Sequence, residues 1–134
     1  MTTAQVGQDN IALVRRGYEA FAAGDMAALT ELFHADAVWH AAPTGIFSGN
    51  YRGRDAIFAF FGQTQQEAAG TFRATPVAMA ASGERVFVLQ EGKAERKGRT
   101  LDASSVLIFT LVDGRVGEVH EYFGDHQSEA AFWS

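Results

Sequence analysis

The feature that most constrains the fold is a change of hydrophobic periodicity near residue 71. From Thr71 onward, β-branched and aromatic residues alternate with polar residues between regularly spaced turn signals, which are Ser82-Gly83, Lys97-Gly98 and Asp113-Gly114. Alternation with a period of two is typical of strands that bury one face, and such turns join antiparallel neighbours. The second half of the chain therefore predicts four antiparallel strands.

The first half of the chain has helical spacing instead. One apolar face is made by Ile11, Val14, Tyr18, Phe21 and Ala22. Gly24 follows this face where a left-handed cap would end a helix, and the carboxylate of Asp25 is suited to cap the next helix. We therefore expect two consecutive helices, the second with an apolar face made by Leu29, Leu32 and Phe33.

A short strand and a third helix are expected before residue 71. Residues 37–41 have the character of a strand, and residues 43–53 are rich in glycine and polar residues, as in a loop. A helix then begins near Arg54 and ends near Gly70, with Asp55 in its first turn. Three helices followed by four strands predict an α+β fold, in which the helices cover one face of a curved, mostly antiparallel sheet.

Length and composition suit one domain. The 134 residues are 47% hydrophobic and include 11 Phe, which suffices for one core, and no linker divides residues 1–134. The chain has no cysteine, so disulfides and thiolate metal sites are excluded. The N-terminus has no basic, apolar export signal and no later run is long enough to span a membrane. We therefore expect a soluble, cytoplasmic protein with no membrane partner.

The charge of the chain argues against a nucleic-acid partner. Its formal net charge is −5, so the field of the molecule repels phosphate backbones. One basic group lies around Gly98 and is interleaved with acidic residues: Lys93, Arg96, Lys97 and Arg99. Mixed charges of this kind are typical of a solvated hairpin tip. We therefore expect that no nucleic acid binds.

Short motifs at the joins between these elements point to a family. They are Ala23-Gly24-Asp25, Leu32-Phe33, Ala35-Asp36-Ala37-Val38, residues 51–57, residues 113–116 and residues 121–125. Together and in this order they resemble the ketosteroid isomerase-like and SnoaL-like branch of the nuclear transport factor 2 (NTF2) superfamily, over nearly the whole chain. The resemblance implies an NTF2-like cone around a mostly apolar pocket. It leaves the activity open, because this fold hosts isomerases, cyclases, hydrolases, dehydratases and proteins that only bind.

The residues that catalyse ketosteroid isomerisation in that family are absent at the matching positions. The family's aspartate base falls at Ala41, its oxyanion tyrosine at Gly17 and its protonated aspartate donor at Leu107. We therefore expect no appreciable steroid isomerase activity.

Glu121 is the first candidate for a catalytic acid or base. In the last expected strand, Val119, Glu121 and Phe123 share one face, and the residues between them share the other. If the first face lines the pocket, as the resemblance implies, desolvation raises the pKa of Glu121 toward the range useful for proton transfer. The alternative is a structural carboxylate that pairs with an arginine or lies at the pocket rim.

His40 is the second candidate, because imidazole titrates near neutrality and this residue precedes the family's base position. Simple alternation puts Trp39 and His40 on opposite faces of the strand. A bulge before Pro43 would reverse which of them faces the pocket. As a base or as a structural histidine, His40 would bond to Tyr18, Glu121 or a ligand oxygen.

Two more polar residues have both a functional and a structural interpretation. The Tyr18 hydroxyl, on the apolar face of the first helix, either donates into the pocket or bonds to a backbone carbonyl. Asp125 either orients a ligand at the pocket mouth or caps a closing helix at Ser128, and we favour the cap. The expected lining residues are Phe33, Trp39, Phe60, Phe61, Leu89, Leu107, Val119 and Phe123.

The sequence predicts no metal and no cofactor. The four histidines, at positions 34, 40, 120 and 126, form no close pair at ligand spacing. No glycine-rich turn joins a strand to a helix as a dinucleotide or phosphate site requires, and no serine lies on a nucleophile elbow.

Two functions are consistent with these features. The first is a cofactor-free isomerase, lyase, cyclase or hydrolase that transfers protons on a small apolar molecule bearing a carbonyl, with Glu121 or His40 moving the proton and Tyr18 stabilising charge. The second is a non-catalytic module of the same fold that binds a small hydrophobic ligand or a protein partner. The resemblance also implies a homodimer formed through the open face of the sheet.

Overall fold

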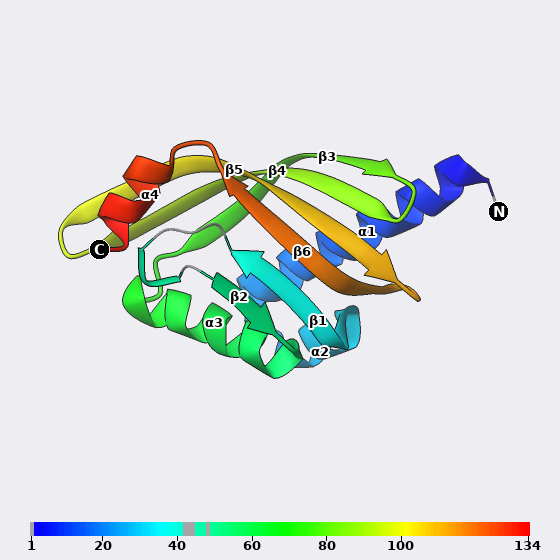
Figure 1. Ribbon diagram of the computed structural model, residues 1–134, viewed down its shortest axis with the longest axis horizontal. Helices are drawn as coiled ribbons and strands as arrows, with labels where there is room; N and C mark the ends of the chain where they lie inside the picture. The colour runs from blue at the N-terminus through cyan, green and yellow to red at the C-terminus, as the bar shows by residue number, and fades with distance from the viewer. Residues whose placement is uncertain (1, 42–44, 48) are drawn as a thin grey trace.

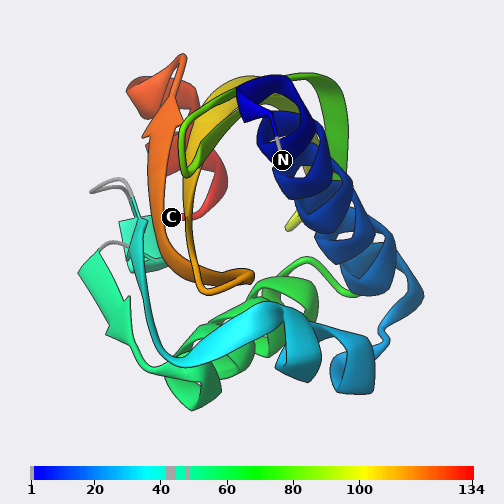
Figure 2. The same ribbon diagram turned by 90° about the vertical axis from the view of Figure 1, so that its right-hand side faces the viewer.

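The structure, a computed structural model, describes residues 2–41, 45–47 and 49–134. It has an α+β architecture with one curved six-stranded sheet (Figures 1 and 2). The helices are α1 (Thr3–Ala23), α2 (Met26–Leu32), α3 (Arg54–Glu67) and α4 (His126–Phe132), and Gly45–Phe47 form a 3-10 turn. The strands are β1 (Phe33–Ala41), β2 (Gly49–Arg52), β3 (Arg73–Ser82), β4 (Arg85–Arg96), β5 (Arg99–Val112) and β6 (Arg115–Phe123).

The helix ends follow from capping residues. Gly24 adopts a left-handed φ of 67° at the end of α1, and Asp25 caps α2 by accepting a 3.1 Å hydrogen bond from the Ala28 N–H. These are the caps that the sequence predicts. The helices are unequal, since α1 has 21 residues and α2 only seven. No helix within the described ranges is both long enough and apolar enough to cross a membrane.

The strands lie in the order β2-β1-β6-β5-β4-β3. Strands β3 to β6 form the antiparallel meander that the alternation predicts, whereas β1 runs parallel to β6 and joins the two halves of the chain. β2 lies within the segment that we interpreted as a loop, so that interpretation was wrong for Gly49–Arg52. The four residues of β2 lie in a glycine-rich segment with little strand propensity. Pairing with β1, and not local propensity, stabilises their strand conformation.

Two hairpin turns take the backbone conformation that matches the twist of the sheet. Lys97 and Gly98 have φ values of 53° and 75°, and Asp113 and Gly114 have 51° and 75°. Two consecutive residues with positive φ form the turn type that two-residue hairpins prefer. The turn signals in the sequence therefore mark the ends of β4 and β5.

The core lies between the sheet and the helices. α1 packs on β3 and β4, α3 packs on β1 and β2, and α4 contacts β5 near one end of the sheet. Figure 2 shows the sheet curving, with α1 and α3 on its concave side. Leu107 and Val119 from the sheet and Ile57 from α3 are almost fully buried there. Side chains that point inward from the strands therefore meet the helices around this concave side.

The basic group around Gly98 is not simply a solvated hairpin tip. Arg96 is 8% exposed and forms an ion pair of 3.0 Å with Glu67. Its guanidinium also donates to the backbone oxygens of Phe132, at 3.2 Å, and Ser134, at 2.6 Å. The interpretation was wrong for Arg96, because this residue occupies an inward position of β4 and holds the C-terminal segment against the hairpin.

Candidate active site

A cavity of about 90 Å³ lies on the concave side of the sheet, lined by residues of α1, α2, α3 and the strands. Aromatic side chains supply much of its wall: Phe21, Phe33, Trp39, Phe60 and Phe61. Its polar lining residues are Tyr18, Thr64, Gln90 and Glu121, and the Thr64 hydroxyl is already bonded to the Phe60 carbonyl. An apolar cavity with a few polar groups is the usual form of a small-molecule site.

Glu121 is the only charged residue among the described residues that line this cavity. Alternation along β6 carries its partly buried side chain inward, as the sequence predicts. Its Oε1 accepts a 3.2 Å hydrogen bond from the indole Nε1 of Trp39. Burial raises the pKa of Glu121 from 4.5 to about 7; the Trp39 bond opposes this rise, and the charge of Glu129 adds to it. The carboxyl group is therefore able to gain or lose a proton near neutral pH.

Tyr18 and Gln90 form the second polar group of the cavity. The Tyr18 hydroxyl donates a 2.8 Å hydrogen bond to Gln90 Oε1, rather than to a backbone carbonyl. Burial, and then the charge of Glu121, raise the pKa of Tyr18, so its phenol stays protonated at neutral pH. Gln90 is 6% exposed, and no acceptor for its amide N–H groups is found among the described residues. The donor that remains available to a ligand is therefore the Gln90 amide.

A second cavity, of about 50 Å³, adjoins the first and shares part of its wall, including Gln90 and Glu121. Glu129 of α4 lines it and is 5% exposed. Glu129 Oε2 accepts a 3.1 Å hydrogen bond from the indole of Trp133, and burial raises the pKa of Glu129. Two carboxyl groups, each bonded to a tryptophan, thus line this second space.

Most of the expected lining residues lie at the cavities, and two do not. Phe123 lines the second cavity. Five others line the first cavity: Phe33, Trp39, Phe60, Phe61 and Leu107. Val119 is fully buried and lines neither cavity. Leu89 was wrongly placed, because it is 42% exposed on the outer face of the sheet. In β4, alternation points Val88 and Gln90 inward. Because both faces of this strand carry apolar residues, the sequence pattern does not show which face is buried.

Asp125 caps α4 and lines neither cavity. Its carboxylate accepts hydrogen bonds from the Ser128 N–H, at 3.0 Å, and from the Ser128 hydroxyl, at 2.7 Å. These bonds lower the pKa of Asp125. The contacts agree with the cap interpretation and contradict the placement of Asp125 among the ligand-binding residues, because its oxygens are already held by the helix N-terminus.

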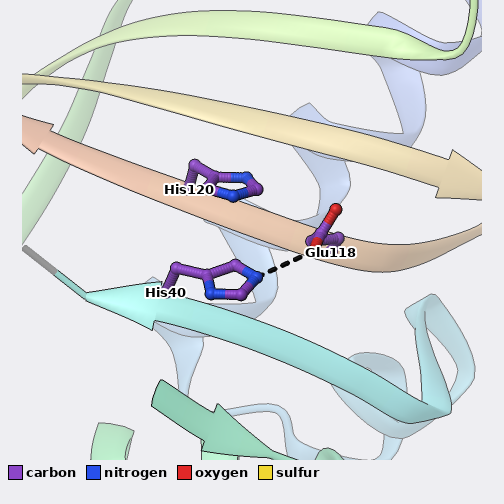
Figure 3. Close-up of side chains that lie close together, drawn as sticks. All are labelled: His40, Glu118 and His120. Carbon is purple, nitrogen blue, oxygen red and sulfur yellow. Dashed lines mark hydrogen bonds and ion pairs between the residues drawn. The ribbon is translucent and has the colours of Figure 1, made fainter. Parts of the chain in front are cut away.

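His40 does not reach the cavity. Residues 38–41 pair with β2 without a break, so alternation holds and Trp39 points inward instead. His40 Nε2 lies 2.7 Å from Glu118 Oε2 (Figure 3). Its Nδ1 lies 3.0 Å from Asn50 Oδ1. The interpretation of His40 as a base in the pocket was therefore wrong, and its ring nitrogens bond to neither Tyr18 nor Glu121.

The same register brings together two histidines that are distant in the sequence. His40 on β1 pairs with His120 on β6, and their rings stack with centroids 4.2 Å apart. Together with Glu118, their ligand atoms lie within 4.8 Å of one another. The sequence argument against a metal depended on spacing along the chain, and a site would need residues from distant segments; the parallel pairing of β1 with β6 brings such residues together.

Sequence reasoning missed Gln90 and Glu129 as parts of the site. The signal for Gln90 is a polar residue within an inward row of β4 that also contains Val86 and Val88. Glu129 lies in a short helix whose sequence gives no indication of what it packs against, so its burial depends on where α4 folds back. The sequence near Gln90 therefore contains a local signal, whereas the sequence near Glu129 does not.

Comparisons with known proteins agree with the fold. The SnoaL-like domain family matches residues 14–119. An uncharacterized protein of Mycobacterium tuberculosis H37Rv, Rv0034, is 31% identical over 91% of this chain and 94% of that protein. The structure of Bal32a, from a soil-derived mobile gene cassette, matches with a TM-score of 0.93 and 40% sequence identity. The match covers 96% of this chain and 98% of the Bal32a chain. An NTF2-like protein of unknown function from Burkholderia pseudomallei K96243 is 25% identical with a TM-score of 0.83, over 94% and 98% of the two chains.

Proposed function

The chain belongs to the SnoaL-like family of the NTF2-like superfamily, and from this premise we propose that it is a cofactor-free enzyme of the isomerase, lyase, cyclase or hydrolase type. Its chemistry is proton transfer on a small, largely apolar molecule that bears a carbonyl or a similar oxygen. The observation that carries the proposal is a carboxyl group, Glu121, in a mostly apolar wall, with a pKa raised to about 7. Perturbed groups of this kind are concentrated at catalytic sites.

In this proposal Glu121 takes a proton from the substrate or returns one to it. Trp39 fixes the orientation of the carboxylate through its indole N–H. The Gln90 amide donates to the substrate oxygen on which negative charge develops, and Tyr18 holds Gln90 in place. Donors of this kind are most effective where water is excluded, because the local dielectric is low.

The lining of the cavity supports an apolar, uncharged substrate. Its aromatic and aliphatic wall encloses about 90 Å³, with about 50 Å³ adjoining, so the molecule is small. Among the described lining residues of both cavities there is no Lys or Arg to pair with a phosphate or carboxylate. We further propose that residues 1–134 act as one domain, because α1 and α4 pack on the same sheet.

The test is exchange of protons next to a carbonyl. A panel of small aromatic and alicyclic ketones is incubated with the pure protein in D₂O, and loss of the α-proton signals is followed by NMR. We expect catalysed exchange of some ketones by the wild type, and a loss of about 10²–10⁴-fold in Glu121→Gln. The matched control is Asp125→Asn, which removes a carboxylate outside both cavities and should leave exchange unchanged. Exchange that survives in Glu121→Gln would contradict the proposal.

A second candidate function is a binding module with no turnover. It is favoured by one observation, the residues Gly17, Ala41 and Leu107 at the positions of the ketosteroid isomerase machinery. The two candidates differ in the same experiment, because a binding module shifts the NMR signals of cavity residues without exchanging ligand protons. Under both, pure protein should give no measurable Δ5 to Δ4 isomerisation of a 3-ketosteroid.

We also propose that the protein forms a homodimer through the outer face of the sheet. Leu89, Val106 and Tyr122 form a row across β4, β5 and β6, and their exposed fractions are 42%, 39% and 54%. Exposed apolar side chains that lie side by side on one face of a sheet mark an interaction site. Light scattering at micromolar concentration should give twice the chain mass, and Val106→Lys should give the monomer mass. A monomeric wild type would remove this proposal.

A further inference from the structure

A second cluster of chemically active side chains lies on the outer face of the sheet, on the side opposite the cavity. Figure 3 shows its three members, His40 from β1 and Glu118 and His120 from β6. Glu118 and His120 are two positions apart on one strand and share a face, and the parallel register places His40 beside His120. The cluster is therefore fixed by the pairing of two strands and not by mobile loops.

We propose that His40, Glu118 and His120 form a binding site for a divalent transition-metal ion of the zinc class. The cluster offers two imidazole nitrogens and one carboxylate oxygen. This ligand set suits Zn²⁺ and its neighbours in the first transition row, whereas Mg²⁺ and Ca²⁺ prefer oxygen ligands alone. Three protein ligands leave one coordination position for water or another small ligand.

The distances within the cluster suit one shared ion. The three ligand atoms lie within 4.8 Å of one another. In a tetrahedral site with bonds of about 2.0–2.1 Å, ligand atoms are about 3.3 Å apart, so small side-chain rotations are enough to close the site. The side chains of His40 and Glu118 are 26% and 43% exposed in the single chain, which leaves room for these rotations.

The hydrogen bonds of His40 leave a position that a cation would fill. Its Nδ1 lies 3.0 Å from the side-chain amide oxygen Oδ1 of Asn50, and its Nε2 lies 2.7 Å from the Glu118 carboxylate. A neutral imidazole carries one N–H, so it can donate to only one of these two acceptors. If that N–H lies on Nδ1, a second proton or a metal ion completes the contact between Nε2 and Glu118. With the N–H on Nδ1, Asn50 orients the ring and Nε2 is free to bind a metal, which is the usual support of a ligating histidine.

His120 is held in position by ring stacking. Its ring stacks on His40, with centroids 4.2 Å apart, and lies parallel to Tyr122 at 6.3 Å. Among the residues that the structure describes, none forms a hydrogen bond with its ring nitrogens. A side chain that is oriented by stacking and has no hydrogen-bond partner within the described part of the chain can bind an ion without breaking an interaction seen there.

The test is calorimetric titration of chelator-treated protein with Zn²⁺, and with Mg²⁺ in parallel. We expect one Zn²⁺ per chain and no detectable binding of Mg²⁺. Asn50→Ala should weaken Zn²⁺ binding by about 10–100-fold, the usual effect of losing a group that orients a ligand, and His40→Ala and His120→Ala should weaken it more. The matched control is His34→Ala, which removes a histidine of the same strand from outside the cluster and should leave the affinity unchanged.

Circular dichroism of each variant verifies that it is folded before titration. If an alanine variant does not fold, His40→Gln and His120→Gln remove the same imidazoles with less change of shape. Zn²⁺ binding that survives in His40→Ala and in His120→Ala, or that is lost in His34→Ala, would overturn the proposal. The absence of one-to-one Zn²⁺ binding by the wild type would overturn it as well. None of these readouts depends on the activity proposed for the cavity.

Discussion

The indole N–H of Trp39 donates a hydrogen bond of 3.2 Å to the carboxylate of Glu121, across the parallel pair of strands β1 and β6. This bond favours the charged carboxylate, whereas burial favours the neutral acid. Burial is the larger effect, so the pKa of Glu121 rises to about 7 instead of falling. The balance between the two effects can be measured, because the donor can be removed while an aromatic ring is kept.

Trp39→Phe should raise the pKa of Glu121 above its wild-type value. The substitution removes the donor that stabilises the carboxylate and retains much of the ring packing against Phe60 and Phe61. The pKa is read from the ¹³C shift of the labelled Glu121 carboxyl group as a function of pH. The control is Trp133→Phe, which removes the donor to Glu129 and should not raise the pKa of Glu121. An unchanged pKa in Trp39→Phe would show that the indole bond has no effect on the carboxylate.

Stability should depend on pH differently in the wild type and in Glu121→Gln. The pKa of Glu121 is raised from 4.5 in the unfolded chain to about 7 in the folded protein, so the folded state binds more protons between these values. The contribution of Glu121 to stability is therefore present below pH 4.5 and is lost as the pH rises through 7. Glutamine does not titrate. The free energy of unfolding of Glu121→Gln, relative to that of the wild type, should therefore rise by about 3 kcal/mol as the pH increases through this window. Urea denaturation at both ends of the window measures the difference, and a constant difference would contradict the raised pKa.

The pair of Tyr18 and Gln90 should behave as one unit. Tyr18→Phe leaves the buried Gln90 oxygen without its donor, which should lower the free energy of unfolding by about 1–3 kcal/mol. Gln90→Leu alone leaves the Tyr18 hydroxyl without its acceptor and should have a similar effect. The double variant should lose less than the sum of the two, because it leaves neither group unpaired. Additive losses in a double-mutant cycle would show that the two side chains are not coupled.

Arg96 should contribute far more to stability than Arg99. Arg96→Met removes charged hydrogen bonds to Glu67 and to two C-terminal carbonyls, and should lower the free energy of unfolding by about 2–3 kcal/mol. Arg99 also donates to the C-terminal segment but is exposed, so Arg99→Met should lower it by less than about 1 kcal/mol. Chemical denaturation compares the two variants directly. Equal losses of unfolding free energy in the two variants would mean that burial does not strengthen the contribution of Arg96 to stability.

The sequence predicts the parts of the fold that depend on neighbouring residues. The caps at Gly24 and Asp25, and the turns at Gly98 and Gly114, are chosen by local backbone chemistry and are found where expected. Glu121 was expected to point inward for the same reason, because alternation along one strand is local. The α+β class follows from these local patterns.

Features that depend on pairing between distant strands were not predictable in the same way. The position of His40 beside His120 follows from the parallel register of β1 and β6, which no residue near either histidine encodes. β4 carries apolar residues on both faces, so the sequence alone could not decide that Leu89 points outward and Gln90 inward. Glu129 became part of the site only because α4 returns to β5. The polar groups around the cavity are therefore partly set by tertiary packing.

The parallel pair of β1 and β6 has a consequence for the order in which the molecule assembles. Phe33 is a register partner of Val116. The hydrogen bonds between β1 and β6 therefore form only after the last strand of the chain is available. Contacts this far apart in sequence slow the folding reaction, because a long loop must close before they form. During synthesis, the sheet cannot be completed until β6 has left the ribosome. Until then the aromatic rings of β1 and α3 lack part of their cover, and transiently exposed apolar surface of this kind promotes aggregation.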